Sequence, residues 1–286
     1  MFELLSDMFA FNRSITGDGV RKTLSRIADE IPIKYTTLKS SQRVFDWTVP
    51  DEWNVTSAKI FDPNGEVIVD FEKNNLYLMS YSIPINKVLT LGELKKHIIT
   101  DESKPDWIPY ATSYYTEDWA FCLPYNFVKN MTEGKYRIEI CSVKDSGELI
   151  YAESFINNGA SKEVLISSYV CHPSMANDSL SGVVLAVQLY KELKKKSNLK
   201  YNYRFLFAPE TIGTISFLFN NSERIKNDLE YGLVATCVGD SGNFTFKKTR
   251  NSNSTLNRIV KNIFSLNEIN GKVIEFSPLG SDERQY

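Results

Sequence analysis

The spacing of apolar residues along the chain changes twice and divides it into three zones. In residues 2–31, apolar side chains recur every three or four positions, which predicts two amphipathic helices separated by the polar stretch 14–19. In residues 45–156 the pattern changes to short β-like runs, with one helix expected over 91–98. From residue 164 onward, strand-like and helix-like segments alternate. The β-like runs of the middle zone are 58–61, 66–71, 76–81 and 136–140.

The last zone predicts an α/β fold. Strands separated by helices at this spacing form a mostly parallel sheet with helices on its faces. We therefore expect an α/β domain with a mostly parallel sheet flanked by helices. The expected strands are 164–170, 203–208, 231–238 and 272–276, and the expected helices between them are 180–193, 212–219 and 254–265.

The composition is that of an ordinary globular protein, and it argues against several classes of partner. Of the 286 residues, 42% are hydrophobic and 24% are charged, and the net charge of −2 provides no basic field for nucleic acid or anionic lipid. No apolar run approaches the roughly 20 residues that span a bilayer. The N-terminus is acidic where a signal peptide is basic, and the four cysteines lack CxxC spacing. We expect a cytoplasmic protein with free thiols and with neither a nucleic-acid nor a membrane partner.

The segment 169–182 (YVCHPSMANDSLSG) carries the strongest candidate chemistry. It places His172 and Asp178 after the first strand of the α/β zone, where open α/β sheets bind their ligands. Imidazole and carboxylate are ligands for zinc or a similar divalent ion. The structural alternative is that Asp178 or Ser179 caps the following helix and that His172 bonds to backbone groups.

Acidic residues also follow the later strands of this zone. Glu210, Asp240 and Asp282 each come after one of them. Because the carboxyl ends of parallel strands open onto one crevice, we expect these residues to converge there with His172 and Asp178. The alternatives are that Glu210 is a first-turn acid favoured by the helix dipole and that Asp240 belongs to a turn.

Parts of these segments resemble the signature of the co-catalytic zinc aminopeptidases. They are His172, residues 176–182 (ANDSLSG) and residues 207–213 (FAPETIG). The resemblance implies that His172 is a metal ligand, that Asp178 bridges two metal ions and that Glu210 is the general base. It also implies zinc, or a similar divalent metal, as the cofactor, with one or two ions bound.

The chain resembles one bacterial family of aminopeptidase-like proteins over almost its whole length. That family has no known substrate and is associated with polysaccharide biosynthesis. The resemblance implies an aminopeptidase-like α/β domain at 1–44 and 151–286, with a small β-rich module inserted at 45–150, which we call the β module. The matching motifs are residues 12–17 (NRSITG), 45–50 (FDWTVP), 81–84 (YSIP), 108–115 (IPYATSYY), 171–178 (CHPSMAND), 209–213 (PETIG), 237–240 (CVGD) and 280–286 (GSDERQY).

Several positions depart from the superfamily pattern. Thr211 stands where a second glutamate would bind a metal, and a hydroxyl is a far weaker ligand than a carboxylate. After the third strand, Asp240 fits chemically as a metal ligand, whereas Cys237 lies nearer the usual register. The last ligand of the superfamily is a histidine in a later segment, so we expect the C-terminal part of the domain to be missing after Tyr286. We interpret the only other histidine, His97, as a solvated residue at a helix end.

The resulting hypothesis is a metal-dependent hydrolase. We expect metal-activated water to attack an amide bond in a small peptide or in an aminoacyl or N-acyl sugar, with Glu210 as the general base. Asp282, Glu283 and Arg284 would bind the substrate, because a carboxylate holds an ammonium group and an arginine holds a carboxylate. The alternative is a non-catalytic aminopeptidase-like binding protein that acts in polysaccharide biosynthesis. Retention of Glu210 favours the enzyme, since a binding protein needs no base.

Overall fold

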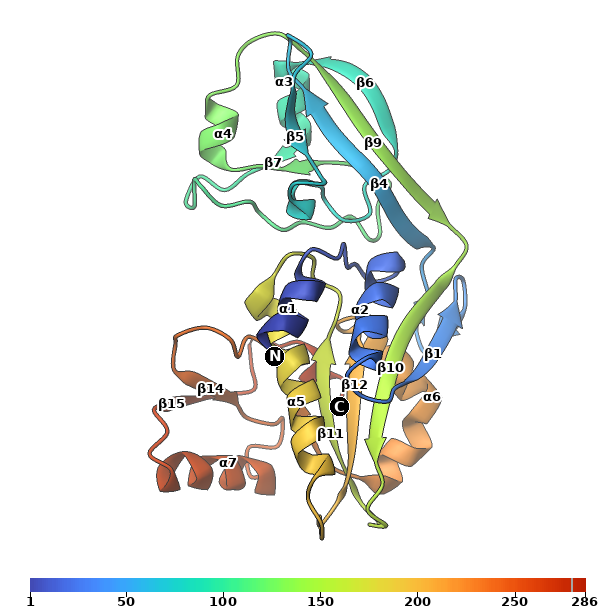
Figure 1. Cartoon of the computed structure of the whole chain (residues 1–286), viewed down its shortest axis with the longest axis vertical. Coiled ribbons are helices and arrows are strands. Elements are labelled where there is room, and N and C mark those ends of the chain that lie inside the picture. Colours follow the sequence, from blue (N-terminus) through green and yellow to red (C-terminus); the bar gives the residue numbers. More distant parts are fainter. Residues whose placement is uncertain (279) are drawn as a thin grey trace.

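The computed structural model describes residues 1–278 and 280–286 and contains two principal sheets. Figure 1 shows a five-stranded sheet with its helices in the lower half of the molecule and the β module above it. The chain crosses between the two halves along two neighbouring strands, β4 (Glu52–Phe61) and β9 (Lys135–Asp145). Both ends of the chain lie in the lower half (Figure 1).

The five-stranded sheet is mixed. Strands β11, β12 and β13 are parallel, whereas β1 and β10 pair antiparallel at one side. The expected α/β class is confirmed, but the expectation of a mostly parallel sheet is met only by the three strands that follow residue 162. The strand order is β1 (Lys34–Lys39), β10 (Glu148–Ile156), β12 (Asn202–Ala208), β11 (Glu163–Tyr169) and β13 (Leu229–Val234).

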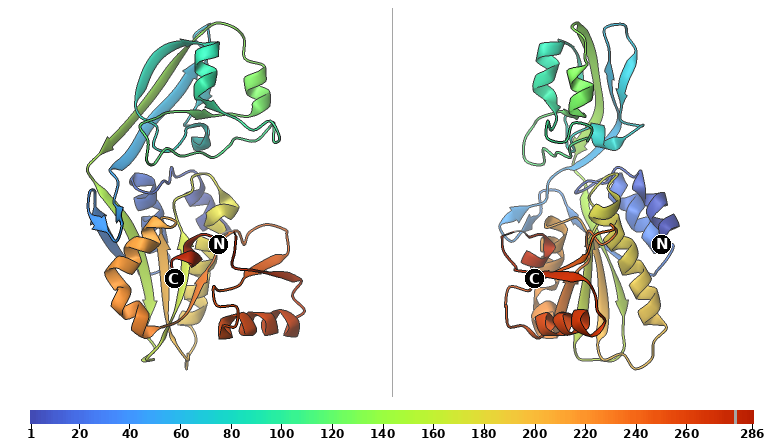
Figure 2. Two further views of the ribbon diagram at one scale, coloured as in Figure 1. Left: turned by 180° about the vertical axis from the view of Figure 1, so that it is seen from behind. Right: turned by 90° about the vertical axis from the view of Figure 1, so that its left-hand side faces the viewer.

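Helices cover both faces of this sheet. Figure 2 shows α1 (Phe2–Phe9), α2 (Asp18–Ala28) and α5 (Gly182–Lys194) on one face and α6 (Ile212–Asp228) on the other. β11 is buried along its length, and its side chains alternate between two apolar clusters. Val164 and Ile166 pack with α1, α2 and α5, while Leu165 packs with α6. Burial on both faces explains why the apolar residues 164–166 are consecutive instead of alternating with polar ones.

The β module is built on an antiparallel sheet. Its apolar core is continuous with the cluster on the α6 side of the lower sheet. The boundaries of the β module at residues 44 and 150 stay a prediction. The strand order is β5 (Val67–Asp70), β4, β9 and β6 (Ile85–Thr90), accompanied by α3 (Leu91–Leu94), α4 (Tyr125–Lys129) and the short pair β7–β8 (Ile98–Ile99, Phe121–Cys122). The other short pair, β2–β3 (Arg43–Val44, Trp47–Thr48), packs on α6.

One strand expected in the β module does not form. The segment 76–81 overlaps a short 3-10 helix, Asn75–Tyr77, and is followed by isolated bridges. The side chain of Asn74 accepts the N–H of Leu76 at 3.0 Å. This local hydrogen bond begins a turn where the apolar pattern alone predicted a strand, so the prediction was wrong.

The last expected strand lies outside the main sheet. β15 (Gly271–Ile274) pairs in parallel with β14 (Phe244–Lys247) in a separate small sheet, so the expectation that 272–276 extends the main sheet was wrong. The expected helix over 254–265 is present as α7 (Thr255–Leu266), and the side chain of Ser254 caps its first turn. No helix in the described part of the chain is long and apolar enough to cross a membrane.

Candidate functional site

The candidate site lies where β11 and β12 end. The two strands run parallel and in register, with Tyr169 opposite Ala208. Cys171 and His172 follow β11, and Glu210 follows β12. Because the strands end together, these three side chains are brought to one edge of the sheet, as expected for the carboxyl ends of parallel strands.

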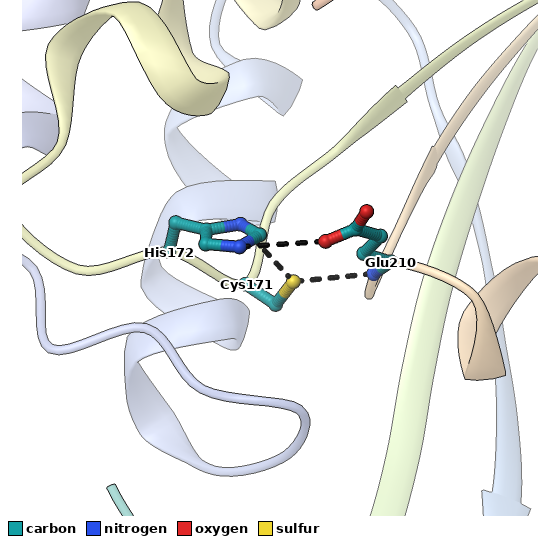
Figure 3. Close-up of side chains that lie close together, drawn as sticks. All are labelled: Cys171, His172 and Glu210. Atoms are coloured by element: carbon teal, nitrogen blue, oxygen red, sulfur yellow. Dashed lines mark hydrogen bonds and ion pairs between the residues drawn. The ribbon is translucent and has the colours of Figure 1, made fainter. Parts of the chain in front are cut away.

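The three side chains form a compact group (Figure 3). Nε2 of His172 is 3.4 Å from Oε2 of Glu210. Nδ1 of His172 is 3.5 Å from Sγ of Cys171, and the backbone N–H of Glu210 donates to the same sulfur at 3.2 Å. One ligand atom from each residue lies within 4.8 Å of the other two. Thiolate, imidazole and carboxylate are all zinc ligands, so the residues present fit a divalent metal.

The surroundings of the group favour the neutral imidazole. Burial lowers the pKa of His172, and the carboxylates of Asp178 and Glu210 only partly oppose this change. The ring is therefore neutral near pH 7, which is the form that binds a metal. Burial also raises the pKa of the Cys171 thiol well above its usual range. A cation that binds here would have to displace the thiol proton.

Asp178 lies outside the compact group but acts on it electrostatically. It belongs to the single turn η3 (Ala176–Ser181) that leads into α5. Its Oδ1 is buried without a hydrogen-bond partner among the described residues. Buried carboxylate oxygens are normally satisfied, so this oxygen is one that a bound cation would satisfy. The capping alternative is not supported, because the Ser179 hydroxyl donates to the carbonyl of Tyr169 and no side chain in the described structure caps α5.

The loop that carries His172 is held in place by a buried arginine. Nε and Nη2 of Arg13 donate to the carbonyl of His172 at 2.9 and 2.6 Å, and Nη1 donates to the carbonyl of Met8. The Arg13 side chain is fully buried, which lowers its pKa to about 10. It remains protonated at neutral pH, so it holds this carbonyl with hydrogen bonds from a charged donor, which are stronger than neutral ones.

The C-terminal segment holds Glu210 from another direction. The hydroxyl of Ser281 donates to Oε1 of Glu210. Thr211 has a φ of 61°, a strained value for a β-branched residue, and its N–H donates to Oδ1 of Asp282 at 2.5 Å. Asp282 is fully buried, and burial raises the pKa of its carboxyl group to about 7. These contacts orient the carboxylate of Glu210 beside His172.

The residues expected to contact substrate in the C-terminal segment differ in exposure. Asp282 has no exposed surface, and its Oδ1 accepts the N–H of Thr211, so its role in substrate binding stays a prediction. Glu283 pairs with Lys247 at 2.7 Å, and Arg284 donates to the carbonyl of Pro278. For Glu283 and Arg284, a role in substrate binding stays a prediction.

Asp240 and Cys237 also lie outside the compact group. Asp240 is exposed, and its Oδ2 accepts a hydrogen bond from Nδ2 of Asn177 at 2.8 Å. Partial burial raises the pKa of the Cys237 thiol, and the charges of Asp178, Asp240 and Glu210 add to the effect. Which of the two side chains serves as a second metal ligand stays a prediction.

Sequence reasoning misjudged one residue and missed three. His97 is half-buried, because its ring stacks on Trp119 with a centroid separation of 4.0 Å and its Nδ1 lies 3.2 Å from the carbonyl of Trp119. The supporting roles of Cys171, Arg13 and Ser281 were not expected. The only signal for them was their presence in the matched motifs, since the spacing of polar residues does not single them out.

Comparisons with known proteins agree with this architecture. A family model described as a domain of unknown function (DUF4910) matches residues 2–286. A curated protein of Clostridium acetobutylicum, provisionally named a polysaccharide biosynthesis protein with aminopeptidase-like domain, is 44% identical over 286 residues, which cover 100% of this chain and 65% of that protein. The chain therefore spans about two thirds of the length of this relative.

Solved structures extend the comparison to the fold. A crystal structure of a provisionally named peptidase from Clostridium acetobutylicum has a TM-score of 0.96 and 45% identity, covering 99% of this chain and 67% of that one. A zinc aminopeptidase from Bacillus subtilis has a TM-score of 0.63 and 10% identity, covering 95% of this chain and 78% of that one. At such low identity, the second likeness shows a shared fold and no more.

Proposed function

We propose that this chain, which belongs to the DUF4910 family, is a metal-dependent hydrolase of aminopeptidase type that cleaves an amide bond. The observation that carries the proposal is the approach of Oε2 of Glu210 to Nε2 of His172, 3.4 Å, at the carboxyl edge of two parallel strands. The name of the curated relative, which includes an aminopeptidase-like domain, supports the same class of reaction.

The residues present suit hydrolysis in distinct roles. A bound divalent metal would polarise the scissile carbonyl and lower the pKa of the attacking water. His172 and Cys171 would hold it. Glu210 keeps 28% of its side chain exposed, so its Oε2 can take the proton of the attacking water while Ser281 fixes Oε1. That proton then goes to the nitrogen of the leaving amine as the amide bond breaks.

We propose zinc as the metal. The donor atoms of Cys171 and His172 suit this ion, and a fold neighbour is named a zinc aminopeptidase. One ion would be held by Cys171 and His172, with Glu210 beside it as the base. A second ion would use Asp178, whose Oδ1 is buried without a hydrogen-bond partner among the described residues, together with Asp240 or Cys237.

The comparisons and the cysteines support proposals for the substrate and the location. The relative's association with polysaccharide biosynthesis supports an aminoacyl or N-acyl sugar, and the aminopeptidase-like fold supports a small peptide. All four cysteines are free, which supports the reducing environment of the cytoplasm. We propose neither a nucleic-acid nor a membrane partner, in keeping with the net charge of −2.

The role of Glu210 is tested by Glu210→Gln, which keeps the shape of the side chain and removes its basicity. We expect zinc content, measured by elemental analysis, to stay at the wild-type level. Turnover on a panel of aminoacyl p-nitroanilides and N-acyl amino sugars should fall about a hundredfold or more. Glu223→Gln, on the exposed surface of α6, is the matched control. Loss of zinc together with turnover would make Glu210 a ligand, and unchanged turnover would remove it from the mechanism.

A further inference from the structure

A tyrosine of the β module reaches the candidate site. The ring of Tyr110 lies 5.5 Å from the ring of His172, centroid to centroid, with the planes tilted by 50°. Tyr169, at the end of β11, packs on the same imidazole at 5.3 Å. Tyr110 is 36% exposed, so part of this residue remains open to a ligand. The edge of the sheet is therefore bordered on one side by a residue of the β module.

Tyr110 is held by an aromatic chain that runs into the core of the β module. Its hydroxyl lies 3.2 Å from the hydroxyl of Tyr114. The ring of Tyr114 meets the ring of Tyr81 edge-on at 5.3 Å, and Tyr81 stacks on Trp53 at 5.5 Å. Tyr81 and Trp53 are almost fully buried. Tyr110 is thus preorganised for contact with a ligand.

One short segment holds both the β module and the loop of His172. Residues 12–17 contain Arg13, which binds the carbonyl of His172, and Thr16. Thr16 Oγ1 lies 2.6 Å from the hydroxyl of Tyr81 and accepts the backbone N–H of Trp53 at 3.1 Å. The hydrogen bonds of Arg13 and Thr16 therefore fix the position of the aromatic chain relative to the imidazole of His172.

The chemistry of Tyr110 suits a neutral ligand group. A tyrosine hydroxyl is protonated at neutral pH and can donate one hydrogen bond. If Tyr114 donates to Tyr110, then Tyr110 keeps its own proton for a ligand. The carboxylate of Glu210, which is proposed as the base and not as a ligand, lies nearby and disfavours an anionic group at this position.

We propose that Tyr110 contacts the substrate, so that the β module forms one wall of the site and takes part in substrate selection. Its ring packs on the group next to the scissile amide, and its hydroxyl donates to an uncharged oxygen of that group, a carbonyl or a hydroxyl. The site therefore selects substrates that carry no negative charge on the group next to the scissile amide. This inference rests on the proposed function, because it assigns a specificity role within the same site.

The test measures binding separately from turnover. The probe is L-serine hydroxamate, which carries a hydroxyl next to its metal-binding hydroxamate. It is titrated calorimetrically into zinc-loaded protein, and the variants are Tyr110→Phe and Tyr110→Ala. Loss of one neutral hydrogen bond should weaken binding about fivefold in Tyr110→Phe. Loss of the ring as well should weaken it about thirtyfold in Tyr110→Ala. KM for cleaved substrates should rise in parallel while kcat changes less than about threefold, as expected for a lost binding contact.

Tyr125→Phe is the matched control, because this tyrosine belongs to α4 of the same module and its hydroxyl donates to Glu102. Wild-type affinity in Tyr110→Ala, with turnover still dependent on Glu210, would overturn the inference and leave the proposed function standing. Binding that depends on Tyr110 in a protein without any turnover would support the inference and overturn the proposed hydrolysis. If kcat fell in Tyr110→Phe while KM stayed unchanged, the inference would also be overturned, because Tyr110 would then act in catalysis and not in substrate selection.

Discussion

The buried carboxyl group of Asp282 should make the stability of this protein fall as the pH rises. Its side chain has no exposed surface, and its pKa is raised from 3.8 to about 7, mainly by burial. Between these two pH values the folded protein keeps this proton while the unfolded chain has released it. The unfolded state then binds fewer protons, so the free energy of unfolding decreases with increasing pH. The contribution is fully present below pH 3.8 and is lost as the pH passes about 7.

The magnitude follows from the same values. A rise from 3.8 to about 7 corresponds to about 4 kcal/mol, at about 1.4 kcal/mol for each pH unit. Asp282→Asn resembles the protonated acid, and its side-chain oxygen can still accept the N–H of Thr211. We expect this variant to match the wild type near pH 4 and to exceed it by up to about 4 kcal/mol at pH 8.

Urea unfolding, followed by tryptophan fluorescence from pH 4 to 8.5, measures this difference directly. Asp46→Asn, in the exposed turn between β2 and β3, is the control and should track the wild type at every pH. A difference between Asp282→Asn and the wild type that stays constant over this range would refute the reasoning. It would mean that Asp282 is ionised in the folded protein throughout.

Two further substitutions test the site and its scaffold. Cys171→Ser should weaken zinc binding by about 10–100-fold or more, the range seen when groups around a metal are lost, as measured by competition with a chelator. Cys141→Ser, on the exposed side of β9, should leave zinc affinity unchanged. Equal zinc affinities for the two variants would mean that Sγ of Cys171 only accepts the N–H of Glu210 and does not bind the metal. Gly182→Ala would place a Cβ 2.0 Å from the carbonyl oxygen of Ala235, so thermal denaturation should reveal a loss of about 2 kcal/mol or more. Gly92→Ala, which meets nothing within 4 Å, should lose no stability, and equal melting temperatures for the two variants would contradict the packing argument.

The part of the fold that could be predicted from the sequence consists of the strands whose two faces are both buried. β11 and β12 are covered on both faces and read as apolar runs, and each is followed by a helix. Their order along the chain was therefore enough to bring His172 and Glu210 together, since parallel strands end at one edge. In the structure, Nε2 of His172 lies 3.4 Å from Oε2 of Glu210.

The remaining features depend on contacts between distant segments, which periodicity does not encode. β10 lies between β1 and β12 and is antiparallel to both. Its own pattern of apolar and polar residues does not indicate which strands it pairs with. Cys171 reads as an ordinary buried thiol until Glu210 is placed beside it. Asp282 was expected to face a substrate at the edge of the sheet, and only the packing of its segment against Thr211 shows that it is buried.

The way in which the chain leaves and re-enters the lower sheet has an evolutionary consequence. β1 and β10 remain paired up to Lys39 and Glu148, so the two points where the excursion into the β module begins and ends are neighbours. A lineage could acquire or lose this excursion at a single hairpin without reordering any strand of the ancestral sheet. Because Arg13 and Thr16 connect the β module to the His172 loop, however, deletion of the module would also disturb that loop. Gain of such an excursion is topologically simple at this hairpin, whereas its removal would cost the geometry of the site.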